Sequence, residues 1–272
     1  MMKQSRFSII VVCLNAGNKL TETVNSILAQ TYTDYEIVVK DGFSKDGSVE
    51  SLPINEKIQI YREKDTGIYE AMNQAIEKAQ GQYLLFLNCG DLFHDNTVLE
   101  QVNRCITEDE RDNGKQHALI YYGNTYTALT DTVVASNPHI DAFACYRNVP
   151  CHQTCFYALS LMRRRAYLPE YKVRADYEHF LWSYFVGEAR PKYMNVTVAD
   201  YEGGGFSETK ENVKRSKKEH TEIVHKYMTN GQILKYKLIL WLTLAPLRSR
   251  IAQNEKWSGM YNKMKDLLYQ RK

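Results

Sequence analysis

The hydrophobic and polar positions of the first 90 residues follow two alternating patterns, which predict the order of the elements. Residues 7–14 (FSIIVVCL) are an unbroken apolar run rich in β-branched residues, typical of a strand buried on both faces. Apolar residues then recur at helical spacing, at Leu20, Val24, Ile27 and Leu28. Further runs of the strand type follow at 35–39, 58–61 and 83–87.

A second helix is predicted over residues 66–79, and Gly81 after it is the stop signal. Its apolar residues lie on one face: Ile68, Met72, Ala75, Ile76 and Ala79. Strands that alternate with helices of this length imply right-handed βαβ crossovers. The pattern therefore predicts an α/β fold with a mostly parallel central sheet flanked by helices.

The pattern after residue 100 is less regular. It predicts strands at 117–122 and 193–199, a hairpin within 126–136, an irregular stretch at 137–150, an extended segment at 152–157 and a helix at 174–186.

Composition places the chain among ordered globular proteins, because 272 residues with 44% hydrophobic content can bury a core. The six cysteines have no paired spacing, and no leader pattern precedes Phe7. We therefore expect the protein to lie in a reducing cytoplasm. Cys151 and Cys155 could suggest zinc, but an extended segment would separate them by roughly 13 Å at about 3.3 Å per residue. Buried structural thiols are therefore the favoured interpretation.

Charge is distributed unevenly along the chain. Residues 210–272 hold 15 Lys and Arg against 5 Asp and Glu, whereas the other 209 residues hold 20 against 27. Within this basic part, residues 238–247 (LILWLTLAPL) are apolar but too few to span a bilayer, which needs about 20. Two interpretations stay open: a segment lying on an anionic membrane surface, or a helix packed on the domain and broken at Pro246.

Polar residues stand where the predicted strands end, at Asn15, at Asp41 and at residues 88–91 (NCGD). Ligands collect at the carboxyl ends of parallel strands, so we expect these residues to form the floor of a cleft. The chain has neither a GxGxxG motif after the first strand nor a P-loop motif. A divalent cation on Asp91 would hold phosphate instead.

Seven ordered segments carry a family resemblance: SIIVVCLN, VVKDGFSKDGS, EKDTGIYEAMNQAI, YLLFLNCGD, CHQTCFY, RADYEHFLW and ADYEGGGFS. In order and spacing they resemble the family 2 inverting glycosyltransferases of the GT-A fold, especially the bacterial members that build O-antigen and other surface polysaccharides. The resemblance covers roughly residues 5–207. It implies a GT-A domain over residues 1–207, followed by a basic helical extension over residues 208–272.

The resemblance also implies a donor site. Its nucleotide-sugar-binding residues would be Asn15, Asp41, Asp65, Asn88 and Gly90. Asp41 would bond the base, Asp65 would help to close the nucleotide pocket, and Asp91 would bind Mn²⁺ or Mg²⁺. The family motif Asp-x-Asp-Asp is reduced here, because Asn88 and Gly90 replace its first two aspartates. A single carboxylate implies weaker metal binding.

The same resemblance implies that Asp176 is the catalytic base, which acts on the attacking acceptor hydroxyl. Inversion requires a carboxylate that takes the proton of the acceptor hydroxyl, opposite the departing diphosphate. His152, Gln153 and Glu178 would lie near the sugar or the acceptor. His152 is equally well explained as a core histidine, and Asp176 and Glu178 as acids that complement the dipole of a helix start.

The expected function is transfer of a sugar from a nucleotide donor, UDP-linked, to a lipid-diphosphate-linked glycan at the inner face of the cytoplasmic membrane. No nucleic-acid partner is expected. One alternative is a sugar nucleotidyltransferase, although that class uses a Gly-rich basic loop where this chain has residues 14–18 (LNAGN). The other is a non-catalytic GT-A-like subunit that only binds nucleotide sugars, which the missing aspartates suggest.

Overall fold

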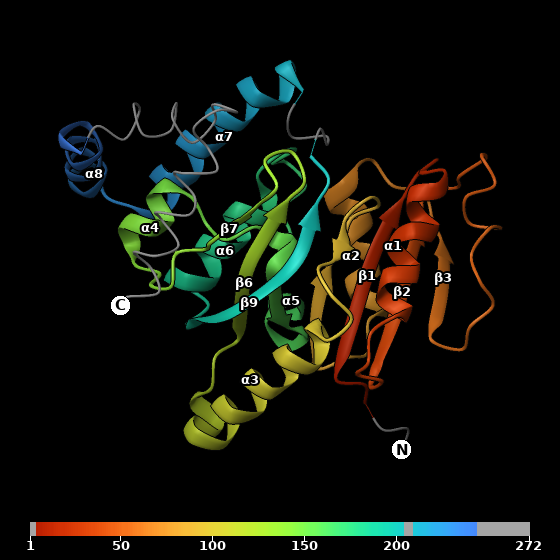
Figure 1. Ribbon diagram of the computed structural model, residues 1–272. Coiled ribbons are helices and arrows are strands. Elements are labelled where there is room, and N and C mark those ends of the chain that lie inside the picture. Colours follow the sequence, from red (N-terminus) through yellow and green to blue (C-terminus); the bar gives the residue numbers. More distant parts are fainter. Residues whose placement is uncertain (1–3, 204–208, 244–272) are drawn as a thin grey trace.

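The computed structural model describes residues 4–203 and 209–243. Its strands are β1 (Phe7–Cys13), β2 (Tyr35–Asp41), β3 (Ile58–Arg62), β4 (Tyr83–Phe86), β5 (Leu92–Phe93), β6 (Ile120–Thr127), β7 (Thr132–Val134), β8 (Cys155–Ala158) and β9 (Pro191–Tyr201). They form a single sheet in the order β3-β2-β1-β4-β8-β6-β9-β5, and β7 pairs with β6 (Figure 1).

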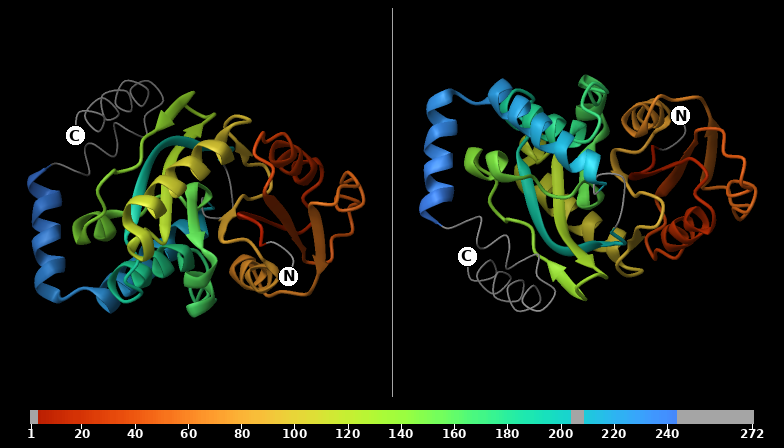
Figure 2. Two further views of the ribbon diagram at one scale, coloured as in Figure 1. Left: turned by 90° about the horizontal axis from the view of Figure 1, so that it is seen from below. Right: turned by 90° about the horizontal axis from the view of Figure 1, so that it is seen from above.

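The helices complete an α/β fold, as predicted. They are α1 (Asn18–Leu28), α2 (Ile68–Lys78), α3 (Val98–Asn113), α4 (Ala142–Arg147), α5 (Leu159–Arg164), α6 (Ala175–Phe185), α7 (Lys210–Tyr227) and α8 (Asn230–Leu242), with short 3₁₀ turns at Gly114–Gln116 and His152–Thr154. Figure 2 shows α1 and α3 on one face of the sheet and α2, α5 and α6 on the other. The sheet is therefore covered on both faces.

Parallel pairing holds in the first half of the sheet, where β3, β2, β1 and β4 are neighbours. Every residue of β2 and β4 is buried, and so is nearly all of β1, which explains their unbroken apolar runs. The second half is mixed: β6 and β9 pair in parallel, while β8 runs antiparallel to both β4 and β6. The predicted parallel character thus belongs mainly to residues 7–86.

The first parallel strands align their carboxyl ends. The register pairs Cys13 with Asp41, and Asp41 with Arg62. Leu87 continues β4 and donates its N–H to Ile10 of β1 at 3.0 Å, so residues 88–91 emerge beside the end of β1. The fold brings the polar strand ends to one edge, as the sequence predicted.

The stretch 137–150, predicted as irregular, contains the helix α4. Asp141 caps it by accepting the N–H of Ala144 at 2.7 Å. The helix has only six residues, too few for the apolar periodicity of a longer helix to appear.

Helix α7 packs against the segment that precedes α6. Glu219 accepts the backbone N–H groups of Lys172, Val173 and Arg174 at 2.9, 3.0 and 2.9 Å. This contact attaches α7 to the rest of the fold but does not bear on the interpretations given for residues 238–247, of which 244–247, including Pro246, lie outside the described residues. No helix among residues 4–203 and 209–243 is long and apolar enough to cross a membrane. The boundary at residues 207 and 208 stays a prediction.

The six cysteines are free thiols. Cys155 is buried and donates its thiol to the carbonyl of Cys151 at 3.2 Å. This agrees with the interpretation of these residues as structural thiols.

Candidate active site

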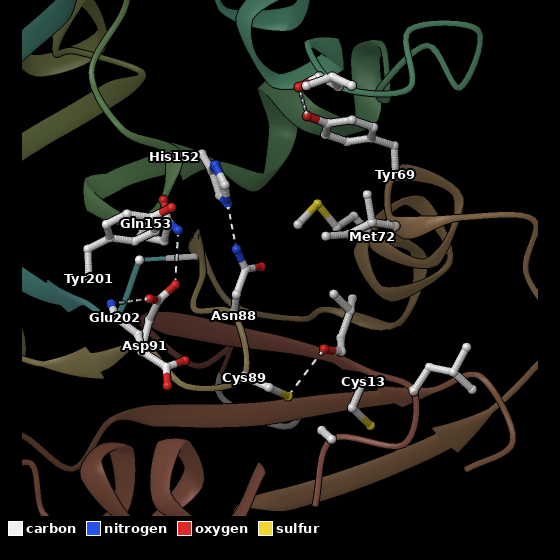
Figure 3. Close-up of a pocket in the computed structure, with 16 residues that line it drawn as sticks. Cys13, Tyr69, Met72, Asn88, Cys89, Asp91, His152, Gln153, Tyr201 and Glu202 are labelled. Carbon is white, nitrogen blue, oxygen red and sulfur yellow. Dashed lines mark hydrogen bonds between the residues drawn. The ribbon is translucent and has the colours of Figure 1, made fainter. Parts of the chain in front are cut away.

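A cavity of about 290 Å³ opens beside the ends of β1 and β4. Its walls come from the end of β1, the start of α2, residues 88–91, the turn His152–Thr154 and the end of β9. Figure 3 shows Asp91, Gln153, Tyr201 and Glu202 at one side of this cavity, and Tyr69 and Met72 at the other. Segments more than a hundred residues apart therefore build one site.

Asp91 lines the side of the cavity that also holds Gln153 and Glu202, and it is only 5% exposed. Its Oδ2 accepts the Gln153 side-chain amide at 2.9 Å, and its Oδ1 accepts the backbone N–H of Glu202 at 3.2 Å. Burial raises the pKa of Asp91 despite these hydrogen bonds, and the negative charge of Glu202 adds to the rise. The two hydrogen bonds of this carboxylate come from neutral groups.

The turn that carries Asp91 requires glycine at residue 90. Asp91 donates its N–H to the carbonyl of Asn88 at 3.0 Å, and Gly90 has φ 99°, which L side chains rarely adopt. A Cβ on Gly90 would stand 2.3 Å from Oε2 of Glu202, so a side chain there would displace Glu202. Lys19 of α1 donates to both carboxylate oxygens of Glu202, at 2.7 and 2.6 Å.

The other side of the cavity leads to Asp176 through a row of hydrogen bonds. The Asn88 amide donates to Nε2 of His152 at 3.1 Å, and Nδ1 of His152 donates to Oδ2 of Asp176 at 3.2 Å. An amide nitrogen can only donate, which fixes the imidazole proton on Nδ1. The Tyr69 hydroxyl lies 2.9 Å from both Oδ1 of Asp176 and the carbonyl of Val173.

These contacts keep Asp176 ionised. Burial by itself raises the pKa of the carboxyl, but the hydrogen bonds from His152 and Tyr69 outweigh it and hold the pKa below its usual value. The Asp176 side chain is 23% exposed; it does not line the cavity itself but lies directly behind His152 and Tyr69, which do. A carboxylate in this state can accept a proton from a bound hydroxyl.

Asp41 is fully buried behind the cavity and does not line it. Its Oδ1 accepts the N–H and the hydroxyl of Ser44 at 2.9 and 2.6 Å, and Nε of Arg62 lies 3.2 Å from Oδ2. Cys13 lines the cavity and donates its thiol to Asp41 at 3.7 Å. One side chain thus separates Asp41 from the open space.

Asn15 and Asp65 lie near the same edge of the sheet. Asn15, with φ 52°, is exposed, and its Oδ1 accepts the N–H of Lys45 at 2.9 Å. Asp65 forms a buried ion pair with Lys40 and lines a second cavity of about 640 Å³. The two cavities share five residues: Val12, Cys13, Leu14, Ile68 and Tyr69. They are therefore adjoining compartments.

Comparison with known proteins identifies this arrangement. The family model described as glycosyl transferase family 2 matches residues 8–171. The chain belongs to glycosyltransferase family 2. It is 33% identical over 224 residues, 79% of this chain and 85% of the relative, to "PGL/p-HBAD biosynthesis glycosyltransferase" of Mycobacterium bovis BCG. The match to the protein of that name from Mycobacterium tuberculosis is equally strong.

Solved structures confirm the GT-A type of fold. Staphylococcus aureus TarS 1–349 in complex with UDP-GlcNAc matches with a TM-score of 0.63 at 17% identity, over 83% of this chain and 68% of that chain. In another crystal structure of TarS 1–349, the match spans 60% of that segment. The Pyrobaculum calidifontis mannosyltransferase PcManGT, in complex with GDP-Man and Mn²⁺, matches with a TM-score of 0.54 at 13% identity, over 98% and 88% of the two chains.

Several predicted site residues of this glycosyltransferase do not line this cavity: Asn15, Asp41, Asp65, Gly90, Asp176 and Glu178. Glu178 is fully buried and bonds Arg165 at 3.2 and 2.6 Å, Lys226 at 2.8 Å, and the hydroxyl of Tyr227. These groups belong to α7 and to the end of α5. The placement of Glu178 therefore does not support contact with sugar or acceptor, and favours a role in packing α6.

The glycosyltransferase also has cavity residues that sequence reasoning missed. Tyr69 was on a predicted helix, and its position next to Asp176 depends on a contact between distant segments. Tyr201 and Glu202 precede the glycines of the last family segment; neither was predicted as a site residue, and both line the cavity.

Proposed function

We propose that this glycosyltransferase moves a sugar, with inversion at the anomeric carbon, from a UDP-linked donor to a lipid-linked glycan in surface polysaccharide biosynthesis. The observation that carries the proposal is a cavity with Asp91 in its wall and, directly behind His152 and Tyr69 of the opposite wall, the carboxylate of Asp176, whose pKa is lowered. An inverting transfer needs a group of each kind, one toward the leaving diphosphate and one toward the attacking hydroxyl.

Asp176 acts as the base in this proposal. The acceptor hydroxyl approaches its carboxylate, loses its proton to it, and attacks the anomeric carbon from the face opposite the diphosphate. His152 holds the carboxylate in orientation through Nδ1, and Asn88 holds the imidazole in turn. Asn88 thus takes a positioning role at the place where the family motif has an aspartate.

The residues present fit a divalent cation that arrives with the donor. Asp91 and Glu202 both line the cavity and offer the oxygen ligands that Mn²⁺ and Mg²⁺ accept. In residues 4–203 and 209–243, no three His, Cys, Asp or Glu side chains are grouped to hold a metal by themselves. The donor diphosphate and water would supply the other ligands. When bound, such an ion neutralises the charge that gathers on the leaving diphosphate.

The donor nucleotide is proposed from the solved relatives, since TarS is in complex with UDP-GlcNAc and PcManGT with GDP-Man. Asp41, Asp65 and Asn15 would form the nucleoside end of the site. Asp41 could reach a base only after Cys13 or Ser44 moves, because both contact its carboxylate. Asp65, which lines the larger cavity, needs no such movement.

The proposed location is the inner face of the cytoplasmic membrane. Helix α8 exposes Leu234, Leu238, Trp241 and Leu242 beside two lysines, Lys235 and Lys237. Such a helix can lie in the headgroup region of an anionic bilayer. Liposome flotation of the full chain and of a Leu238→Glu, Trp241→Glu variant tests this, and equal flotation of both would contradict it.

A thermal-shift panel tests the donor assignment. UDP, GDP, dTDP and CMP are each added with and without Mn²⁺. A ligand at 100 times its Kd stabilises the folded state by about 2.7 kcal/mol, which raises Tm by several degrees. We expect the largest rise with UDP and Mn²⁺ together. A larger rise in Tm with GDP would assign a GDP-linked donor instead of a UDP-linked one. No rise with any nucleotide would contradict the proposed function.

A further inference from the structure

The space beside Gly90 is filled by a residue from the far end of the sheet. The usual family motif has an aspartate at this position, whereas this chain has glycine. The Oε2 atom of Glu202 stands 2.3 Å from where a Cβ of residue 90 would be. Glu202 can therefore occupy this place only because residue 90 has no side chain.

Glu202 is fixed in this place by two contacts. Its backbone N–H donates to Oδ1 of Asp91 at 3.2 Å, which ties the end of β9 to the turn after β4. Its carboxylate accepts two bonds from the ammonium of Lys19. Both Asp91 and Glu202 line the cavity, at the side where Figure 3 shows them together.

We propose that Glu202 supplies the second carboxylate of the divalent-cation site, taking over from β9 the role that residue 90 of the motif has lost. The inference rests on the proposed function, because the cation is the one that accompanies a nucleotide diphosphate. Asp91 and Glu202 would each give oxygen ligands, and the diphosphate the others.

Lys19 explains how two neighbouring carboxylates are tolerated before the donor arrives. Its ammonium neutralises Glu202, and both side chains are about half exposed. An exposed ion pair of this kind contributes little to stability, so exchanging it for a divalent ion costs little. The released ammonium then faces the same anionic ligand. Lys19 thus competes with the ion for Glu202.

The competition gives a test in which two substitutions act in opposite directions. Free Mn²⁺ is measured by its electron paramagnetic resonance signal during titration of the protein with UDP present. We expect Glu202→Gln to weaken Mn²⁺ binding at least about 10-fold, with Asp91→Asn as the reference for a lost ligand. Lys19→Met removes the competitor and should tighten Mn²⁺ binding.

Two controls separate a ligand role from a structural one. Glu202→Gln keeps the shape of the side chain and the N–H that bonds Asp91, and Glu202→Asp should restore part of the Mn²⁺ affinity. Glu222→Gln removes an exposed glutamate of α7, paired with Lys218 at 3.7 Å, and should leave Mn²⁺ affinity unchanged. A melting curve of each variant confirms folding.

Mn²⁺ affinity equal to wild type in Glu202→Gln would overturn the inference. So would a loss of UDP affinity in both Glu202→Gln and Lys19→Met with Mn²⁺ binding intact, because the pair would then act only as a phosphate clamp. If the wild-type protein binds neither UDP nor any other nucleotide of the panel, the proposed function fails first, and the two failures are thus distinguished.

Discussion

Asp91, in the wall of the cavity, and Asp176, directly behind the opposite wall, are similar carboxylates in opposite electrostatic states. Burial pushes the pKa of Asp91 and of Asp176 upward alike. Asp91 has only an amide and a backbone N–H as donors and faces the charge of Glu202, so its pKa stays raised. Asp176 has an imidazole and a phenol as donors, and its pKa is lowered. The difference shows that the neighbouring groups, more than burial, decide which acid can serve as a base.

A second contrast lies within one helix. Asp176 and Glu178 are two residues apart on the first turn of α6, and residues at this spacing point to different sides of a helix. Asp176 points to His152 and Tyr69, whereas Glu178 points to the buried contact with α7. The sequence pattern marked both as acids of a helix start and gave no sign of this division.

The largest expected effect is that of Asp176→Asn. Losing the base should lower turnover of the donor by about 10²- to 10⁴-fold, because general base catalysis contributes a factor of that size. UDP release from the donor in initial-rate assays measures the change. A variant that keeps more than a tenth of wild-type turnover would remove Asp176 from the role of base.

Glu178→Gln should affect stability instead of chemistry. It leaves Arg165 and Lys226 without their buried counter-charge, and removing one partner of such a group costs about 3 kcal/mol. Urea unfolding measures the loss, and kcat per folded molecule should stay near wild type. A stable but inactive Glu178→Gln enzyme would instead place Glu178 in the catalytic site, as the sequence first suggested.

The smallest effect expected is a change of pH profile in His152→Ala. Wild-type Asp176 stays ionised to pH values below the usual carboxylate range, so kcat should persist into acid. Without His152, burial is opposed by fewer hydrogen bonds, the pKa of Asp176 rises, and the acid limb of kcat moves to higher pH. A variant with lower kcat but an unmoved acid limb would mean that His152 does not act through Asp176.

Sequence pattern predicted the fold best where burial is uniform. The strands β1, β2 and β4 appear as apolar runs because both faces are covered. The antiparallel partners of β8 and the two-residue strand β5 could not be predicted, because their pairing depends on segments far apart in the chain.

The site was predicted in the same uneven way. Residues 88–91 and His152 followed from strand ends and from the family resemblance, and the fold brings them together. Asp41 was placed at the correct edge, one side chain behind the cavity. Glu202 and Asp91 are 111 residues apart in the sequence, and no local pattern predicts a contact between them.

Calorimetric titration of UDP in the presence of Mn²⁺ tests the division of roles between the two sides most directly. The wild-type protein is compared with Asp91→Asn and Asp176→Asn. We predict that Asp91→Asn weakens binding, whereas Asp176→Asn binds as tightly as wild type. Weakening by Asp176→Asn alone, or by both variants equally, would contradict a cavity in which one side binds the leaving group and the other takes the proton.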